Sequence, residues 1–428
     1  MVAPTVVIAK EIVMRTRPRF ASHPLPAFAL LMLGVLTMFA TALAQAQTLN
    51  VLYSFTDSGN VGDQPYSGLV MDQAGRLYGT TAYGGEHGYG TVYRVSRAGS
   101  GWIATGLYSF QGGMDGDTPV ANVTFGPDGT LYGTTFSGGE GYGTVFNLRP
   151  PATVCKAAQC PWIEAVLYRF TGGSDGGFGD SFASYADALV FDQAGNVYGT
   201  TSGGGTNGDG VVFKLTRSGE SWTESVLWNF TGASDGGYPA SGVIFDSAGN
   251  LYGTASEGGA HNDGVVYELS PSGSGWTQTT LYAFRGSEDG YSPPFGGVTM
   301  DAQGNLYGTT GVFSDSGGEA YELTLSGGSW TVSKRQTFSA YEGPVDTPTL
   351  DAQGNLYGTI PFDDESVAEV FKLTPSGNGW IYTHFYQFNG SNGFTPVGGV
   401  IFDASGNLYG TTSLGGQYTD GLVWEITP

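Results

Sequence analysis

The sequence has 428 residues, with 72 Gly, 20 Pro, 14% aromatic residues and only 13% charged residues. The aromatic content and low charge density exclude a disordered chain, and Gly residues that do not recur at every third position exclude collagen. A net charge of −22 argues against nucleic acid or an anionic membrane surface as a partner. Length alone predicts about three domains.

Residues 1–46 have the layout of a secretory signal peptide. Four basic residues, Lys10 to Arg19, precede the apolar stretch PAFALLMLGVLTMFATALA, and small-x-small patterns end at Ala44 and Ala46. The alternative is an uncut membrane anchor, but the apolar stretch is short for a span of about 20 residues. We therefore expect cleavage near Ala44 or Ala46 and a secreted or extracytoplasmic protein. Residues 47–428 contain no further candidate span and carry 12 Lys and Arg against 37 Asp and Glu, a net charge of −25.

A phrase of the form D-x-x-G-N-L-Y-G-T-T recurs seven times along residues 47–428. Its successive tyrosines are 50 to 66 residues apart. They are Tyr78, Tyr132, Tyr198, Tyr252, Tyr307, Tyr357 and Tyr409. A repeat of this length is typical of propellers and other arrays, so the repeats replace the estimate of three domains.

Each repeat contains four strand-like runs, here designated A to D. In the fourth repeat they are GVIFD, NLYGTA, GVVYEL and GWTQTTLYAF, rich in Val, Ile, Tyr, Phe and Thr and bounded by turn residues. The A–B and C–D connections are short, and the Asp and Gly-Asn of the A–B connection suit a tight hairpin. The runs are nearly continuously apolar, which indicates sheets that are covered on both faces.

The two ends of this region complement each other. It begins with TLNVLYSF, a D run without A, B or C, and ends with GVIFD, NLYGTT and GLVWEIT, which lack a D run. An open solenoid would instead need polar end caps. We therefore predict an all-β fold, a single seven-bladed β-propeller of four-stranded antiparallel blades over residues 47–428. The N-terminal strand should complete the last blade, and we expect a monomer.

The phrases LYGTT, GG-x(n)-G-T/V-V-F-K-L and W-x-E-x-V-L-Y-x-F resemble the bacterial tandem repeats called GloVer, found in exported "choice-of-anchor" proteins. The resemblance covers essentially all of residues 47–428. It implies an extracellular protein of a group without an assigned reaction. Such proteins often carry a C-terminal anchoring segment, whereas this sequence ends at Pro428, directly after a C run.

One rim of the predicted ring is acidic. Strand parity places the B–C loops and the D-to-A loops at that rim, and they hold more than half of the acidic residues of 47–428. The negative electrostatic field of so many carboxylates should hold cations or attract a basic protein surface. Asp115 and Asp117 are candidates for Ca²⁺, the one cofactor considered, and the wider binding set adds Asp175, Asp235 and Asp289. The alternative is that these Asp residues only serve turn geometry, because no loop has the full D-x-D-x-D-G spacing.

Two further features of this rim suggest binding. Tyr238 and Tyr291 are candidates for stacking against a sugar of a glycan. The B–C loops of the fifth and sixth repeats depart from the common pattern, and the sixth contains the densest acidic cluster, Asp363, Asp364 and Glu365. This irregularity marks either a ligand site or sequence drift. The six Trp residues that open the D runs are expected to pack between blades.

Little in the sequence supports catalysis. No nucleophile elbow, phosphate loop or dinucleotide fingerprint occurs, and His384 lies in a D run, where we expect it to be packed. A glycosidase would need two carboxylates, for which Glu257 with Asp263 or Asp364 are trial pairs. The leading hypothesis is therefore a binding or structural interaction module that contacts its partner through the acidic rim. The alternative is a carbohydrate-active enzyme, a glycoside hydrolase or lyase using rim carboxylates.

Cys155 and Cys160 lie in the one long C–D loop. In an exported protein they predict a local disulfide. A zinc site would need further ligands close to the two cysteines, and the sequence has none there. This bond should tie down a local insertion rather than support the fold.

Overall fold

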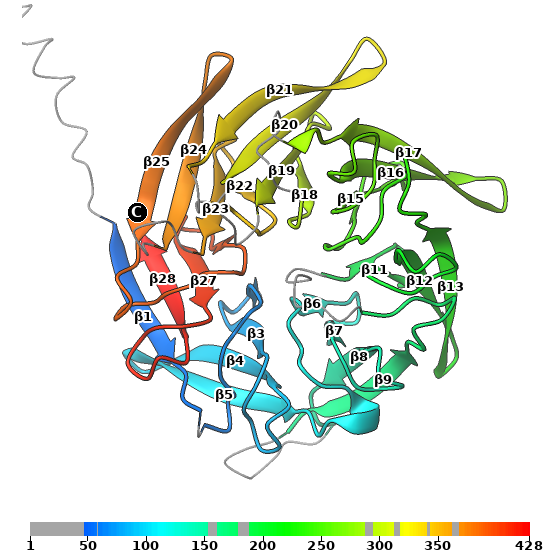
Figure 1. Ribbon diagram of the computed structural model, residues 1–428. Helices are drawn as coiled ribbons and strands as arrows, with labels where there is room; N and C mark the ends of the chain where they lie inside the picture. The colour runs from blue at the N-terminus through cyan, green and yellow to red at the C-terminus, as the bar shows by residue number, and fades with distance from the viewer. Residues whose placement is uncertain are drawn as a thin grey trace, which may run out of the picture. The chain divides into compact units, whose positions relative to one another are not determined.

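A computed structural model gives the architecture of residues 47–57, 59–152, 161–178, 188–286, 294–311, 317–339, 343–361 and 368–428. Residues 47–428 form one compact unit. Its strands form seven antiparallel sheets of four strands each, arranged around a common axis as a β-propeller (Figure 1). The predicted fold class is confirmed.

The first four blades follow the chain in the order A, B, C, D from the axis outward. Their strands are β2 (Val70–Met71), β3 (Leu77–Thr81), β4 (Thr91–Ala98) and β5 (Gly101–Ser109); β6 (Thr124–Phe125), β7 (Leu131–Thr135), β8 (Thr144–Arg149) and β9 (Ile163–Arg169); β10 (Val190–Phe191), β11 (Val197–Thr201), β12 (Val211–Ser218) and β13 (Ser221–Asn229); β14 (Ile244–Phe245), β15 (Leu251–Ala255), β16 (Val265–Ser272) and β17 (Gly275–Ala283). A 3-10 turn, η1 (Gly113–Asp115), lies between the first two blades.

The remaining three blades repeat this order, and the last one takes its outer strand from the other end of the chain. Their strands are β18 (Val298–Met300), β19 (Leu306–Gly311), β20 (Gly318–Ser326) and β21 (Ser329–Thr337); β22 (Thr349–Leu350), β23 (Leu356–Ile360), β24 (Glu369–Ser376) and β25 (Gly379–Gln387); β26 (Ile401–Phe402), β27 (Leu408–Thr412), β28 (Leu422–Thr427) and β1 (Thr48–Ser54). Strand β1 pairs with β28 from Thr48 opposite Thr427 to Ser54 opposite Leu422, which closes the ring as predicted.

The recurring phrase is explained residue by residue in the fourth blade. Asp246 Oδ1 accepts hydrogen bonds from the backbone N–H groups of Ala248 and Asn250, at 2.8 and 2.9 Å. Its Oδ2 accepts from the Asn250 side chain at 2.8 Å and from the Tyr252 hydroxyl at 3.2 Å. Gly253 leaves space for an aromatic ring of strand C, because a Cβ there would lie 2.5 Å from the Tyr267 hydroxyl.

The first threonine of the phrase joins neighbouring blades. Thr200 Oγ1 donates to the Ser241 carbonyl of the next blade at 2.7 Å, and Thr411 Oγ1 donates to the Ser67 carbonyl across the ring closure at 2.6 Å. These hydroxyls are buried, so each bond satisfies a polar group that would otherwise be costly to bury. The phrase therefore specifies both the A–B turn and the contact between blades.

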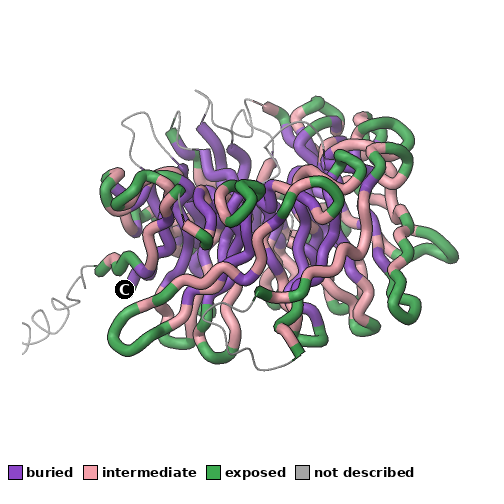
Figure 2. Tube along the Cα trace, turned by 90° about the horizontal axis from the view of Figure 1, so that it is seen from below, coloured by how far each residue is buried: buried purple, intermediate pink, exposed green. Residues whose placement is uncertain are grey.

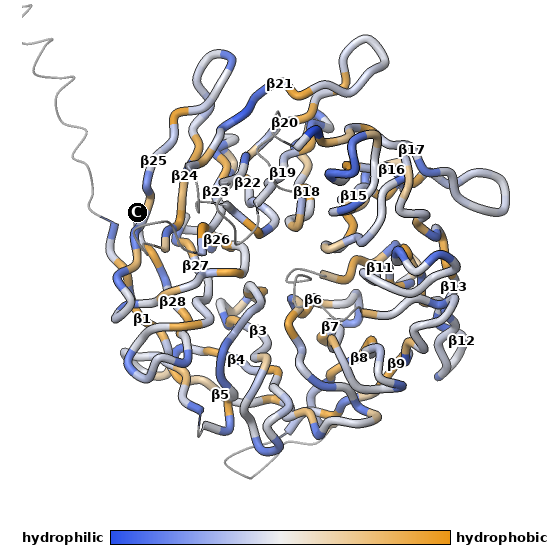
Figure 3. The backbone as a smooth tube through the Cα atoms, viewed as in Figure 1, coloured by the Kyte–Doolittle hydropathy of each residue, from blue (hydrophilic) through white to orange (hydrophobic). Residues whose placement is uncertain are grey.

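The hydrophobic core lies between blades rather than at a single centre. One buried cluster joins Tyr198 and Val212 of the third blade to Val243, Leu251 and Tyr267 of the fourth. In the side view, buried residues occupy the middle of the ring and exposed residues the loops at its two rims (Figure 2). Hydrophobic segments occur all around the ring (Figure 3). The D-strand tryptophans contribute as expected, since Trp222 contacts Tyr132 of the preceding blade with ring centres 6.4 Å apart.

Candidate functional site

The B–C loops and the D-to-A loops lie together at one rim, here called the loop rim; the A–B and C–D turns form the opposite turn rim. In the described part of the chain, five D-to-A loops pair with the B–C loop of the blade that follows them. Asp117 pairs with Ser137 in this way, and Gly237 pairs with Glu257. The backbone N–H of Asp117 donates to the Ser137 carbonyl at 2.9 Å. The loops of adjacent blades therefore support one another.

The candidate carboxylates of the D-to-A loops occupy equivalent positions and anchor these loops. Asp115 Oδ2 accepts from the Tyr108 hydroxyl and from the Gln111 backbone N–H, both at 2.9 Å. Asp175 Oδ2 accepts from the Tyr168 hydroxyl at 3.0 Å and from the Thr171 N–H at 2.9 Å.

Asp235 repeats this arrangement with an indole N–H in place of the hydroxyl. Its Oδ2 accepts from Trp228 Nε1 at 3.2 Å, and its Oδ1 accepts from the Thr231 hydroxyl. In three blades these Asp residues therefore stabilise the turn of the D-to-A loop, which was the alternative to cation binding. A cation would share oxygen atoms that already accept hydrogen bonds.

Asp117 lies beside Asp115 in the same loop, and its Oδ1 accepts from the Thr118 hydroxyl. In the part of the chain that the structure describes, no group of three or more His, Cys, Asp or Glu side chains is placed to hold a metal ion. Carbonyl oxygens would have to supply most ligands of a Ca²⁺ at Asp115 and Asp117. The Ca²⁺ site stays a prediction.

Tyr238 lies half-buried in the loop rim with a backbone φ of 54° directly before Pro239. Its N–H donates to the Asp209 carbonyl at 2.8 Å, and its own carbonyl accepts from the Ser256 N–H at 3.0 Å. A positive φ before proline is costly for a residue with a side chain, so these contacts hold a strained backbone in place. Its role as a sugar platform stays a prediction.

Several predicted site residues lie outside the described residues. They are Asp289, Tyr291, Asp363, Asp364, Glu365 and both cysteines, Cys155 and Cys160. The described members of the trial catalytic pairs are Glu257, which is exposed, and Asp263, which is half-buried.

Two buried carboxylates of the loop rim were not singled out from the sequence. Asp63 is 8% exposed, and its Oδ1 has no hydrogen-bond partner among the described residues. Burial first, and then the charges of Asp420 and Asp57, raise its pKa to about 6. Asp420 comes from the last blade, and its Oδ2 accepts from the Asp57 N–H at 3.0 Å. Three acidic residues therefore meet beside the ring closure.

Asp346 is 1% exposed and lies at the inner end of its D-to-A loop. Its Oδ2 accepts from the backbone N–H and the hydroxyl of Thr359, both at 3.2 Å. Burial raises its pKa to about 7, although these bonds act in the opposite direction. Serine occupies the equivalent position in two other blades as Ser67 and Ser241. In the sequence Asp187, which lies outside the described residues, has the same position in the third repeat, and the other five repeats have Ser, Ala or Gly there. Acids at a position that is small in the other five repeats were the signal that could have identified Asp346.

Among the described residues, four tyrosine side chains are exposed on the loop rim. They are Tyr83, Tyr89 and Tyr142 of the first two blades and Tyr418 of the last blade. All four come from B–C loops. Tyr83 pairs with Asp63, and Tyr418 precedes Asp420 by two residues. The rings of Tyr89 and Tyr142 lie over Gly112 and Gly172 of the D-to-A loops that carry Asp115 and Asp175. This sector combines negative charge with aromatic side chains that reach solvent.

His384 differs from the expectation that it is packed. Its side chain is 56% exposed, and its Nδ1 lies 2.6 Å from Oε2 of Glu369 on the neighbouring strand β24. The Tyr382 hydroxyl bonds the other Glu369 oxygen. His384 lies on the same face of β25 as Tyr382, with their ring centres 4.8 Å apart, and both side chains bond the buried Glu369 carboxylate at the outer edge of the blade.

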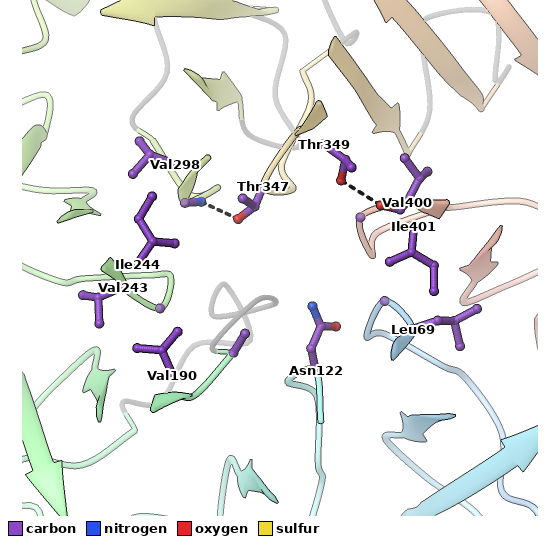
Figure 4. Close-up of a pocket in the computed structure, with 15 residues that line it drawn as sticks. Leu69, Asn122, Val190, Val243, Ile244, Val298, Thr347, Thr349, Val400 and Ile401 are labelled. Atoms are coloured by element: carbon purple, nitrogen blue, oxygen red, sulfur yellow. Dashed lines mark hydrogen bonds between the residues drawn. The ribbon is translucent and has the colours of Figure 1, made fainter. Parts of the chain in front are cut away.

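A small cavity of about 220 Å³ lies on the propeller axis (Figure 4). The innermost segments of all seven blades line it with aliphatic side chains such as Leu69, Val190 and Ile401. Two of its polar side chains are committed: Thr347 Oγ1 accepts from the Gly297 N–H at 2.8 Å, and Thr349 Oγ1 donates to the Val400 carbonyl at 2.7 Å. A third, Asn122, has its Oδ1 buried with no hydrogen-bond partner among the described residues. The cavity is too small for a drug-sized ligand.

These features define a seven-bladed β-propeller with one acidic, tyrosine-bearing loop rim. The family model described as the Gloeobacter/Verrucomicrobia repeat matches residues 35–178 and 164–360. The chain belongs to this repeat family. None of the curated proteins matches it.

Three solved structures are similar to this chain in fold. One is described as an oxidoreductase (glucose dehydrogenase) from Thermus thermophilus, with 14% identity, a TM-score of 0.43 and coverage of 89% of this chain and 100% of the other. One is described as a 6-phosphogluconolactonase from Bacteroides uniformis, with 14% identity, a TM-score of 0.46 and coverage of 76% and 85%. One is described as a polysaccharide lyase, an ulvan lyase, with 12% identity, a TM-score of 0.47 and coverage of 88% and 95%. Likeness at this level indicates nothing about activity.

Proposed function

We propose that this protein is an exported binding or structural interaction module whose contact surface is the loop rim. The observation that carries the proposal is the sector around the ring closure, where exposed tyrosines stand beside acidic residues on loops that neighbouring blades support. Tyrosine is enriched at the centres of interfaces, and a rigid loop loses little entropy on binding. The partner that this chemistry fits best is a basic protein surface.

Export fits this role. Cleavage near Ala44 or Ala46 would remove four basic residues and leave a chain of net charge −25. Among the described residues no helix is long and apolar enough to cross a membrane. N-terminal sequencing of the protein recovered outside the cytoplasm of a bacterial host should begin at residue 45 or 47. A start at Met1 in the membrane fraction would indicate an uncut anchor.

The contact surface can be tested with an immobilised peptide rich in Lys and Arg. Binding should weaken steeply as salt is raised, because exposed charges are screened. Tyr89→Ala and Tyr142→Ala should each weaken binding about tenfold, as truncation of a tyrosine hot spot does. Ile103→Ala is the matched control, because Ile103 is similarly exposed but lies on β5 near the turn rim. Equal losses in all three variants would contradict the proposal.

The Ca²⁺ prediction needs a separate measurement. We propose Asp115 and Asp117 as ligands, so the melting temperature should rise in CaCl₂ relative to a chelator, and the rise should disappear in the Asp117→Asn variant. Identical midpoints in CaCl₂ and chelator would overturn the metal site without affecting the basic-partner proposal.

The same purified protein should be incubated with polysaccharides. Release of shortened products, lost in a Glu257→Gln variant, would replace the binding module with a carbohydrate-active enzyme.

A further inference from the structure

A second cavity lies between the second and third blades, away from the loop rim. It has a volume of about 310 Å³, and its walls include Asp128, Asn147, Arg149, Arg217, Glu220 and Trp222. We call it the blade 2–3 groove. It is formed by the A–B turn and strands of one blade and the C–D hairpin of the next, so it opens at the turn rim.

Two guanidinium groups line this groove although acids far outnumber bases in the chain. Arg149 and Arg217 are both exposed, and neither forms an ion pair within 4.0 Å with any described residue. Arg217 Nε donates to the Gly219 carbonyl at 3.0 Å, which leaves its terminal N–H groups for other partners. Guanidinium groups present several donors in a fixed plane that matches a carboxylate.

The ring contains a matched arginine that is paired. Arg97 occupies the equivalent place on the first blade, 4.5 Å from the centre of the Trp102 ring, and its guanidinium lies 3.8 Å from Glu425 of the last blade. In the blade 2–3 groove, Asn147 stands where Glu425 stands at the ring closure. The substitution of a neutral amide for the glutamate explains why Arg217 has no carboxylate partner there.

The acidic residues of the groove do not pair with its arginines as Glu425 pairs with Arg97. Asp128 accepts three hydrogen bonds, from the Thr130 N–H and hydroxyl and from the Tyr132 hydroxyl, at 2.8 to 3.0 Å. Burial raises its pKa, but these bonds together outweigh burial and hold the pKa below its usual value. Glu220 is exposed on the hairpin. The oxygens of Asp128 therefore already accept hydrogen bonds from its own hairpin, whereas the terminal N–H groups of the arginines remain available to a ligand.

Trp222 supplies a flat apolar wall. Its indole is half-buried, with Tyr132 on one side and the Arg217 guanidinium 6.0 Å from its ring centre. An aromatic face packs against the C–H face of a sugar ring. Asn147 donates its amide hydrogens to the Thr130 hydroxyl and the Leu131 carbonyl, which leaves its side-chain oxygen as an acceptor for a ligand hydroxyl.

We propose that the blade 2–3 groove binds a carboxylated pyranose, a uronate residue of an acidic polysaccharide. The arginines bind the carboxylate, the indole packs against the ring, and Asn147 accepts from a hydroxyl. This site is independent of the basic partner proposed for the loop rim.

Isothermal titration with oligogalacturonate tests the proposal, with the fully methyl-esterified oligomer as the neutral comparison. Arg217→Gln and Arg149→Gln should each weaken oligogalacturonate binding at least about tenfold, because each removes a charge-assisted hydrogen bond. The matched control Arg97→Gln and the rim variant Tyr89→Ala should bind like the unaltered protein. The neutral oligomer should bind the unaltered protein at least about tenfold more weakly than the acidic one.

Several outcomes would overturn the proposal. They are equal affinity for the neutral oligomer, an Arg97→Gln loss as large as that of Arg217→Gln, or inorganic sulfate competing at the same concentration as the sugar. Melting temperatures of all variants within about 2 °C of the unaltered protein would exclude unfolding as the cause of lost binding. Failure of this test would leave the rim proposal intact, since Tyr89 and Arg217 lie at opposite rims.

Discussion

Carboxylates at the two rims of this propeller respond to their surroundings in opposite directions. At the turn rim, burial raises the pKa of Asp246, but hydrogen bonds from Asn250, Ala248 and Tyr252 outweigh it and lower the pKa below its usual value. At the loop rim, burial raises the pKa of Asp63 to about 6 and that of Asp346 to about 7.

The difference lies in the number of donors that each carboxylate meets. Asp246 accepts four hydrogen bonds, whereas Asp346 accepts from Thr359 alone and one oxygen of Asp63 accepts none among the described residues. Donors stabilise the charged form, and burial without them destabilises it. The turn-rim aspartates thus hold the repeat together when ionised, while the buried loop-rim aspartates weaken the fold when ionised.

The largest expected effect belongs to Asp346→Asn. The folded-state pKa of about 7 exceeds the ordinary 3.8, so the stabilising contribution of protonated Asp346 is present at low pH and lost as pH rises through 7. The amide imitates the protonated acid. At pH 8 the variant should therefore raise the free energy of unfolding by up to about 4 kcal/mol, and at pH 5 by only about 1.5 kcal/mol, because the carboxyl of the unfolded chain loses its proton above pH 3.8.

Urea unfolding at pH 5 and pH 8 measures this difference. Ser241→Ala is a matched control at the equivalent position of the fourth blade, and its effect should not depend on pH. A gain from Asp346→Asn that is equal at both pH values would show that the carboxylate does not titrate in this range.

Asp246→Ala should have the next largest effect, with the opposite sign. It removes the acceptor of four hydrogen bonds and leaves the Tyr252 hydroxyl and the Asn250 amide without their partner, which should cost about 2–3 kcal/mol at pH 7. The control is Asp263→Ala in the loop rim of the same blade, for which we expect less than about 0.5 kcal/mol. Urea unfolding of both variants compares the two rims within one repeat. Equal losses would remove the distinction between them.

The contrast between the rims also marks what could be predicted from the sequence. The Asp and Tyr of the repeated phrase lie six residues apart in one hairpin, so the hydrogen bond between Asp246 and Tyr252 depends on local geometry that recurs with the phrase. Ring closure was predictable for a similar reason, because the missing D run at one end and the surplus D run at the other can only be paired with each other.

The properties of the loop rim and of the blade 2–3 groove depend on residues far apart in the chain. Asp63 meets Asp420 only because the ring closes, and Arg149 meets Arg217 only because two blades pack at a particular register. Burial and the count of hydrogen-bond donors decide what such groups do, and neither follows from residue type. Asp346 and Ser241 occupy the same place in the repeat and still differ in chemistry.

The smallest expected effect comes from an outer strand, where the chain itself contains the comparison. Glu224 of β13 has its pKa raised to about 7, first by burial and then by the charge of Asp175, and its Oε1 has no hydrogen-bond partner among the described residues. At the equivalent position of the next blade stands Gln278, whose Nε2 donates to the Asp235 carbonyl at 3.1 Å. Glu224→Gln copies that arrangement.

Glu224→Gln should stabilise the protein at pH 8 by less than about 1 kcal/mol, because Glu224 is half-exposed and solvent screens its charge. The gain should be smaller at pH 5 and vanish below about pH 4.5, the ordinary value of the glutamate pKa, because the stabilising contribution of the protonated form is lost between that value and the folded-state pKa of about 7. The reverse substitution, Gln278→Glu, should destabilise at pH 8 by a similar amount, and that loss should also be smaller at pH 5. Thermal unfolding of both variants at the two pH values measures these shifts. Effects of the same sign at pH 8 would contradict this prediction. They would show that the loss of stability from an ionised glutamate depends on the burial of one particular blade and not on the position in the repeat.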